Sequence, residues 1–590
     1  MPRLAARPAP CPHRPAAHTR WRAGLGAMAL LAAGTAAAAD RHWSQLSCPT
    51  GGAWLDTCWA GAPSQLANGS APQSGDTAWI GGGVAVRYLQ PAGQLNPLAS
   101  LRLDATLTLA DPLSALVADT AVIGTTDPAS VVHSAGRAQF GQLVIRRGGT
   151  GQGRYTLQGS AQLSSASTVV GQSSNALFEQ IGGAHTVTTT LTLGQTTSFS
   201  EYRLAGGTLQ VGQTVLGMGR LSLGGGTLRV GSGNVEIGSL EVGTDPGGFR
   251  LTVDGAAPGA DNTLGAITAN STLVVGNGFA GTVVQRSGVV VVAGDTSVGR
   301  AGGTGRVTVE GGLFSVSGRM SMGDGGEGRF AQTGGVVNVG SVLMSLGNSG
   351  QSILTLRGGE LNTVRLLGNR DRSQLALEGG SLGAGLQEIS VGLLDIAAGS
   401  GTSFALRVDR SGGAGSASVV NARQVMLGLG GTLRRGDGGL NVQQVDNAGL
   451  LALGGPQSFV SLLQRPGSTL ELAGPLFVEG PLTLAGTLRL AGAAPASGVD
   501  LDLLDWGTLS GRFDAIDASA WALDPGWVLD TSRLYVDGVL RVAPVPEPAT
   551  AVLLLAGGAL LWARRRPCGP RANPTAGALD PLFSGVGRAA

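Results

Sequence analysis

RVTVEGGLFSV, residues 306–316, is followed by RFAQTGGVVNV at residues 329–339 and by ILTLRGGELNTV at residues 353–364. Each copy holds a short alternating apolar segment, a turn centred on glycine, and a second alternating segment. Alternation with a period of two is typical of a strand with one buried face. Glycine adopts the positive φ of a tight turn without a Cβ clash. The stretch therefore predicts pairs of strands joined by tight turns and repeated along the chain.

The same unit recurs from residue 178 to about residue 395, and most copies add a third short segment that ends in glycine, such as LTLG at residues 191–194. Repetition at a fixed period indicates stacked units that bury their apolar faces against each other. We expect an all-β fold, an elongated right-handed parallel β-helix (β-solenoid) with rungs of roughly 20–24 residues. The second glycines of the turns stand at Gly183, Gly207, Gly226, Gly288, Gly312, Gly335, Gly359 and Gly380.

Extending this period over residues 75–542 predicts roughly twenty rungs and, at about 4.8 Å per rung, a rod on the order of 100 Å long. A propeller or sandwich of repeating hairpins is the alternative, but propeller blades repeat at about 40 residues or more. The predicted organisation is a signal peptide at 1–39, an N-terminal cap at 40–90, the start of the solenoid at 91–177, Gly-rich repeats at 178–395, their continuation at 396–500, a C-terminal cap at 501–544, a sorting signal at 545–566 and a tail at 567–590.

The first 39 residues have the pattern of a secretory signal peptide, including an apolar signal helix. Five arginines precede an apolar stretch at residues 23–33, and small residues end at Ala39. We expect the secretion machinery to export the chain and signal peptidase to cleave it between Ala39 and Asp40. An amphipathic or disordered N-terminus that stays in the cytoplasm is the alternative.

Composition restricts the possible functions. The chain has 100 glycines, 13% charged residues and 4% aromatic residues, and all of its 40 basic residues are arginine, which excludes a lysine-based catalyst. Ten arginines fall in the two terminal segments, which leaves the body with 30 arginines against 37 acidic residues and a net charge of about −7. A body of that sign is not expected to bind nucleic acid.

The exported body has two cysteines, Cys48 and Cys58, and the simplest prediction for an oxidising compartment is one disulfide between them. A zinc site would need further ligands, and the three histidines of the body are widely spread. Tryptophans occur on either side of the repeats and not within them, so we expect them to close the two ends of the solenoid, with an aromatic sugar-binding platform as the alternative. These tryptophans are Trp43, Trp54, Trp59, Trp79, Trp506, Trp521 and Trp527.

The C-terminal region has three parts in a fixed order: the motif Pro546, Glu547 and Pro548, an apolar run at 549–563, and the stop-transfer residues Arg564, Arg565 and Arg566. We expect one transmembrane helix within residues 545–566, with its arginine end in the cytoplasm. The run gives a helix of only about 22 Å, against roughly 30 Å of hydrocarbon, so it suits a temporary hold better than a permanent anchor.

This region resembles the PEP-CTERM sorting signal of Gram-negative, exopolysaccharide-producing bacteria. The resemblance implies that an exosortase is the partner, that an inner-membrane intermediate is released to the cell surface or extracellular matrix, and that exopolysaccharide is a possible contact. Residues 40–86, 501–516 and 527–542 resemble the ends of autotransporter-type β-helical passengers. The 24 residues from Pro567 to Ala590 depart from the sorting pattern, because such signals usually end close to the arginines.

No catalytic, cofactor-binding or metal-binding constellation is expected. Asp324 and Glu327 are interpreted as a solvated turn, and Arg370, Asp371 and Arg372 as a second polar turn. The sequence thus favours a non-enzymatic surface or matrix protein that is structural or adhesive. A β-helix lyase or hydrolase that acts on polysaccharide is the alternative, and it would gain support from a groove that holds arginine beside acidic residues or several acids.

Overall fold

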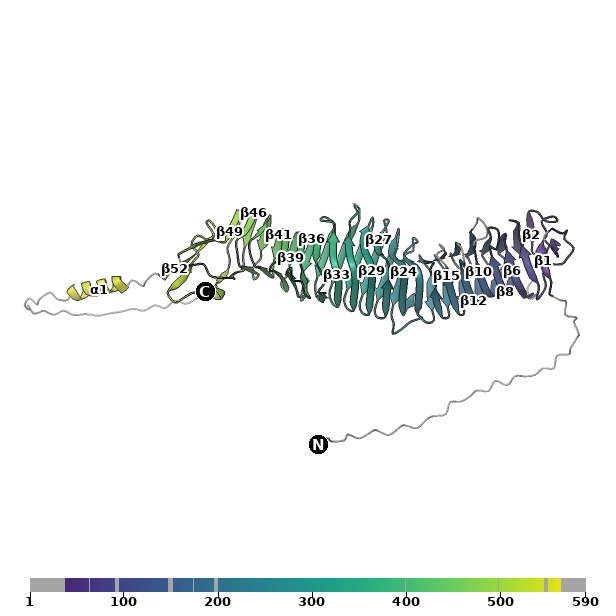
Figure 1. The fold of residues 1–590 in the computed structure, drawn as a ribbon, viewed down its shortest axis with the longest axis horizontal. Coiled ribbons are helices and arrows are strands. Elements are labelled where there is room, and N and C mark those ends of the chain that lie inside the picture. Colours follow the sequence, from purple (N-terminus) through teal and green to yellow (C-terminus); the bar gives the residue numbers. More distant parts are fainter. Residues whose placement is uncertain are drawn as a thin grey trace, which may run out of the picture.

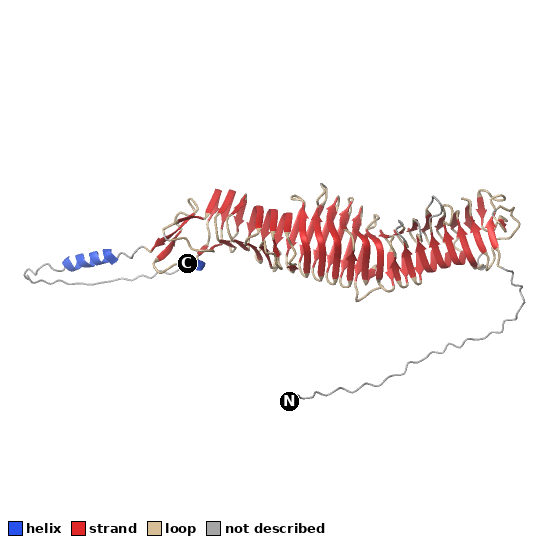
Figure 2. Cartoon of the chain, viewed as in Figure 1, coloured by secondary structure: helices blue, strands red, loops and turns tan. Residues whose placement is uncertain are grey.

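The computed structural model describes residues 38–62, 64–90, 95–146, 152–172, 175–195, 200–347, 349–397, 399–496, 498–545 and 550–563. The described residues up to 545 form one elongated rod of strands that lie across its long axis (Figures 1 and 2). The described part of the chain makes a β-solenoid of about 18 turns with about 23 residues each, close to the predicted rung length and slightly below the predicted number. The all-β fold and the stacked repeat are therefore confirmed.

Each rung has three sides, and one long strand can supply two of them. The strand β28 (Thr304–Val309) gives one side, and β29 (Leu313–Asp324) bends between Val316 and Arg319 to give the other two. The next rung begins with β30 (Glu327–Gln332), which pairs with β28 in parallel. Among the described strands, 42 form one continuous sheet, and a further seven form the third side of the C-terminal rungs.

The predicted alternation is seen directly in the burial pattern. Leu221, Leu223, Leu228 and Val230 are fully buried inside the rod, whereas Arg229 between them is exposed. Parallel register stacks each inward residue on the equivalent residue of the next rung, as for Leu209 on Leu228. The core is therefore a set of apolar columns that run the length of the rod, each rung contributing one residue per column.

The turns between sides are set by glycine. Gly335 has φ of +69°, and a Cβ placed on it would lie 2.5 Å from the backbone oxygen of Gly312 in the preceding rung. A side chain there would both strain the backbone and separate two rungs. This explains why the second glycine of the turn recurs at the period of the rung.

The interior also holds a polar and aromatic column near the N-terminal end. Tyr155, Phe178 and Tyr202 stack in successive rungs, with ring centroids 5.0 and 4.5 Å apart. His133 Nδ1 lies 2.9 Å from the Tyr155 hydroxyl, and His185 Nδ1 lies 3.0 Å from the Tyr202 hydroxyl. Burial lowers the pKa of His133 to about 4 and that of His185 to about 3, so both imidazoles are neutral at pH 7.

Three tryptophans close the N-terminal end. Trp43, Trp54 and Trp59 are buried, and the ring centroids of Trp54 and Trp59 are 4.9 Å apart. Cys48 and Cys58 are joined by a disulfide whose Cα atoms are 5.8 Å apart. The strands β1 (Asp40–Trp43) and β3 (Trp59–Ala60) pair antiparallel above the first parallel rung, so that the first rung does not end in an open sheet edge.

The C-terminal end is closed by a different device. Three antiparallel strands, β48 (Asp500–Asp502), β51 (Trp527–Asp530) and β52 (Val539–Pro544), form a small sheet after the last rungs. Trp521 is buried, and its indole N–H donates to the carbonyl of Ala491 at 3.3 Å. Trp506 and Trp527 are only half-buried, as is Trp79 at the other end.

The C-terminal helix differs from the prediction. The helix α1 (Thr550–Ala563) has 14 residues, and among the described residues no helix has both the length and the apolar character that crossing a membrane requires. The predicted transmembrane helix over 545–566 is therefore not found among the described residues. The signal helix, Pro546, Glu547, Pro548, Arg564, Arg565, Arg566 and the tail lie outside the described residues.

Candidate functional site

One corner of the solenoid changes shape near residue 370. The strand β33 (Glu360–Gly368) and the strand β34 (Ser373–Leu377) are joined by a four-residue loop at 369–372. In the next two rungs the equivalent corner is a single residue within one continuous strand, Gly392 in β36 (Glu388–Ile396) and Arg423 in β39 (Val419–Leu427). The loop therefore projects beyond the corners that follow it and leaves a step in the edge of the rod.

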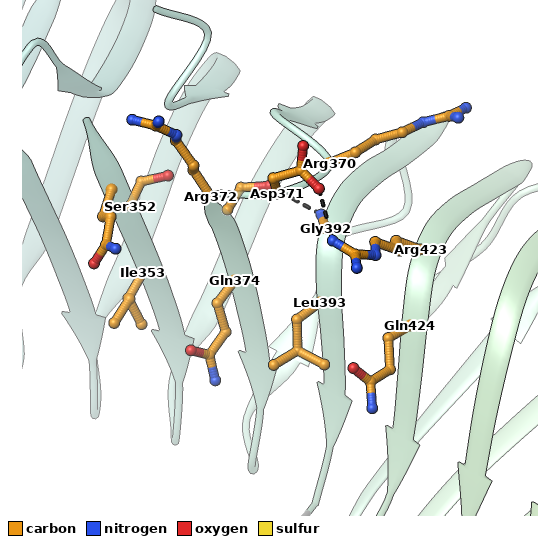
Figure 3. A pocket seen from close by; sticks show the side chains of 12 residues that line it. Ser352, Ile353, Arg370, Asp371, Arg372, Gln374, Gly392, Leu393, Arg423 and Gln424 are labelled. Carbon is orange, nitrogen blue, oxygen red and sulfur yellow. Dashed lines mark hydrogen bonds and ion pairs between the residues drawn. The ribbon is translucent and has the colours of Figure 1, made fainter. Parts of the chain in front are cut away.

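An open cavity of about 340 Å³ lies at this step. Its floor is one outward-facing row in which Ile353, Gln374, Leu393 and Gln424 occupy successive rungs, each paired in register with the next. Figure 3 shows these four side chains side by side on adjacent strands, with the charged residues of the loop along one edge. All four are half-buried, so the floor alternates apolar and amide groups. We call this feature, with Arg370, Asp371, Arg372 and Arg423, the corner groove.

Four charged side chains form the wall of the corner groove. Arg423 Nη1 donates to Asp371 Oδ1 at 2.7 Å, which joins two corners that are 52 residues apart in sequence. The side chains of Arg370 and Arg372 are exposed, and their guanidinium groups make no ion pair or hydrogen bond with any other described residue. The wall therefore has three guanidinium groups against one carboxylate, a net charge of +2.

The groove continues along the rod in both directions. A cavity of about 280 Å³ shares Arg370 and Arg423 and is lined further on by the amides of Asn441, Gln443 and Gln457. On the other side a cavity of about 620 Å³ shares Asp371 and Arg372, and Glu327 and Gln351 also line it. The three cavities share walls, so a polymer laid along the axis would pass from one to the next.

The carboxylates of this region are already paired. Glu327 is hydrogen-bonded to Arg329, and Asp371 to Arg423. Hydrolysis of a glycosidic bond needs two carboxyl groups, one as the proton donor and one as the base or nucleophile. The groove does hold arginine beside acidic residues, which is the arrangement expected to support the enzyme alternative.

Both predicted polar turns are found, and the turn at 370–372 also forms one wall of the corner groove. Asp324 is exposed at the end of β29, and Glu327 starts β30, so this pair forms a turn. Arg370, Asp371 and Arg372 also lie in a turn, but that turn makes the wall of a groove. The groove could not be read from the residues alone, because it depends on how the corner at 369–372 compares with the corners of the next two rungs.

Another, smaller cavity of about 140 Å³ lies at the N-terminal end, beside the rings of His42 and Trp79, which are tilted by 49° with centroids 4.9 Å apart. It also contains Asp104, whose pKa burial would raise, but hydrogen bonds from Thr125 and Thr126 outweigh burial and hold the pKa below its usual value. Through these hydrogen bonds Asp104 holds the loop that contains Thr125 and Thr126. Two of the predicted end tryptophans, Trp43 and Trp79, line this cavity, and the half-buried Trp79 offers a ring on which a sugar could stack.

Metal ligands are not gathered anywhere in the described ranges, since these contain no group of three or more His, Cys, Asp or Glu side chains close enough to hold an ion. Comparisons of the chain with protein-family models, with curated proteins and with solved structures found no match.

Proposed function

We propose that this chain is an exported structural or adhesive protein of the cell surface or extracellular matrix, sorted through its C-terminal PEP motif by an exosortase and associated with exopolysaccharide. We take the coil to be right-handed, the hand that parallel crossover connections favour. The single observation that carries the proposal is the rod itself, whose stacked rungs are closed at both ends. Such an object presents long polar rows at a fixed spacing, so that many weak contacts act together.

The exposed rows of the rod suit this role. Outward positions carry Thr, Ser, Gln, Asn and Arg in register, as where Asn441 donates to Asn421 at 2.8 Å from the neighbouring rung. Polar side chains in rows can hydrogen-bond a hydrated polymer at every rung. A load along the rod is carried by interstrand hydrogen bonds and buried columns in every turn, as a matrix component requires.

The C-terminal helix supports a transient hold at a membrane. Its described apolar side chains are all exposed, with Trp562 82% accessible, and none packs on the rod. An apolar helix without a protein partner is stable in an apolar solvent and not in water. The apolar side chains concerned are Leu553, Leu554, Leu555, Leu560, Leu561 and Trp562.

The test is fractionation and intact-mass measurement of the protein in cells with and without the exosortase. We expect a shorter surface form only when the enzyme is present, and a full-length membrane form when it is absent. The triple variant P546A/E547A/P548A should remain in the membrane form in both strains. The matched control E479A/P495A, which changes an acid and a proline of the rod, should be sorted normally. A full-length form in the membrane of both strains would refute the proposal.

A polysaccharide-active enzyme is the second candidate, favoured by Asp371 and Glu327 beside arginines in one groove. Incubation with polyuronic acid should then release reducing ends, with an unsaturated product if the reaction is an elimination. Activity that survives in D371N and in E327Q would exclude these carboxylates. No product with neutral or acidic polymers at long incubation would dismiss the enzyme and leave the structural role.

A further inference from the structure

We infer that the corner groove binds a carboxylate-bearing polysaccharide whose chain lies parallel to the long axis of the rod. The inference rests on the proposed function, because only an exported rod meets such a polymer. It goes further in naming the site and the ligand chemistry. The three parts of the site are the floor, the arginine wall and the open ends of the groove.

The floor fits an extended sugar chain in spacing and in chemistry. Successive floor residues belong to successive rungs, so they repeat at about 4.8 Å, comparable to the length of one hexose unit. Ile353 and Leu393 offer apolar surface for the C–H face of a pyranose, and Gln374 and Gln424 offer amide donors and acceptors for its hydroxyl groups. The alternation therefore presents one apolar and one hydrogen-bonding unit for every two sugars.

The wall provides the charge that selects an acidic polymer. Arg370 and Arg372 have unused donors at the edge of the floor, and a guanidinium binds a carboxylate through two parallel N–H bonds. Arg423 is held by Asp371 at 2.7 Å, which fixes the third guanidinium beside the floor. With a net charge of +2 at the wall, a neutral glycan would leave the arginines unsatisfied and would gain only the floor contacts.

The same features argue against a nucleic acid in the groove. Binding of a single strand relies on aromatic rings that stack on the bases, and no aromatic side chain lines the three cavities. A carboxylated glycan has one charge per sugar and pyranose faces that suit the floor.

The test measures binding of a hexauronate, a neutral hexasaccharide of the same length and a short single-stranded DNA to the full chain in a sugar-free, non-ionic detergent. Calorimetry should detect the hexauronate and neither of the other two. The variant R370Q/R372Q should weaken hexauronate binding by about tenfold or more, since both bidentate contacts are lost. R370K/R372K should recover part of it, because charge returns without the planar fork.

The matched control is R87Q/R137Q, which removes two exposed arginines without side-chain partners in the described structure, many rungs away from the groove. It should bind hexauronate like the unmodified chain, and Q374A/Q424A should weaken binding with both arginines present. Equal losses in the control, equal binding of the neutral hexasaccharide or the DNA, or no binding of hexauronate would overturn the inference. Sorting in the exosortase experiment is read out separately, so either idea can fail alone.

Discussion

Arg423 and Asp371 lie 52 residues apart in sequence and meet at 2.7 Å, where the four-residue loop overhangs the one-residue corners of the next rungs. Both side chains are more than half exposed, so their ion pair contributes little to stability. Its effect is on charge and position, since it neutralises one of three guanidinium groups and holds it beside the floor of the corner groove.

Replacing Asp371 should therefore alter binding without altering the fold. We expect D371N to strengthen hexauronate binding by a few-fold, because the net charge of the wall rises from +2 to +3. Raising the ionic strength from about 0.05 M to about 0.5 M should weaken binding in both proteins and by more in the variant. Calorimetry at the two salt concentrations measures this, with D295N, at a paired carboxylate elsewhere on the rod, as the control. Weaker binding by D371N would contradict the electrostatic account.

Buried histidines should make the rod sensitive to acid. The pKa of His133 is about 4 and that of His185 about 3 in the folded chain, both lowered mainly by burial, against about 6.5 in the unfolded chain. The stabilising contribution of each neutral imidazole is complete above pH 6.5 and is lost as the pH falls to the folded pKa. We expect stability to drop between about pH 6.5 and pH 4, by on the order of 1.4 kcal/mol per pH unit for each histidine.

Thermal unfolding between pH 8 and pH 4 measures the effect, and H133Q/H185Q should flatten the curve above about pH 4.5, where carboxylates begin to titrate. If that variant does not fold, NMR titration of the unmodified chain is decisive. The two imidazoles should remain neutral at about pH 5, and protonation of either near pH 6.5 would refute the prediction.

The hydroxyl of Tyr202 should matter more than its ring. It donates to Gln180 Oε1 at 2.6 Å and lies 3.0 Å from His185 Nδ1, inside a fully buried column. Y202F keeps the stacking on Phe178 but removes a partner from two buried polar groups, at a cost of about 1–3 kcal/mol. Denaturant unfolding measures it against Y535F, a half-buried tyrosine near the C-terminal end. Equal effects of the two variants would show that the buried hydroxyl is not needed.

The disulfide should protect the N-terminal end in particular. Joining Cys48 to Cys58 closes a short loop over the buried tryptophans, which predicts a loss of about 2–3 kcal/mol when it is removed. Because each rung contacts only its neighbours, C48S/C58S should speed hydrogen exchange in the first rungs and leave the middle of the rod unchanged. The matched control is C11S/C568S, which replaces the two cysteines of the terminal segments outside the exported body. Uniform loss of protection along the rod would contradict a local role.

The sequence predicts the parts of this fold that repeat. Leu221, Leu223, Leu228 and Val230 follow strand alternation, and burial at each of them is a local consequence of the period of two. The position of tryptophans at the two ends of the rod can also be predicted, because the sequence has no tryptophan between residues 79 and 506. The repeat period and the composition determine these features, because every rung buries equivalent apolar positions against its neighbours.

The corner groove does not follow from such patterns. The groove depends on the residues that pair with Leu393 in the two neighbouring rungs. It also depends on the difference between a corner of four residues and the one-residue corners that follow, so both features compare one rung with the next. Likewise the sequence shows His133 and His185 only as isolated residues, because the contacts of His133 with Tyr155 and of His185 with Tyr202 join side chains from different rungs. Local periodicity contains no information about these non-local contacts. The helix predicted to span a membrane is described only over Thr550–Ala563, and no described helix has the length and apolar character that crossing requires.

The turn glycines offer a test of whether stacking, and not only backbone geometry, requires them. Gly335 and Gly467 both have positive φ, +69° and +77°, so alanine strains the backbone at either position by about 1–2 kcal/mol. A Cβ on Gly467 meets no atom within 4 Å, whereas one on Gly335 would lie 2.5 Å from the Gly312 oxygen. That oxygen accepts the Val336 N–H at 2.9 Å, so it cannot move away without breaking the ladder between rungs. We therefore expect G335A to lower the unfolding midpoint well beyond G467A, and to increase hydrogen exchange in the two rungs that meet at Gly312. If the two variants are equally stable, the turn glycines serve only the backbone angle, and the close stacking of rungs at the turns is not what selects them.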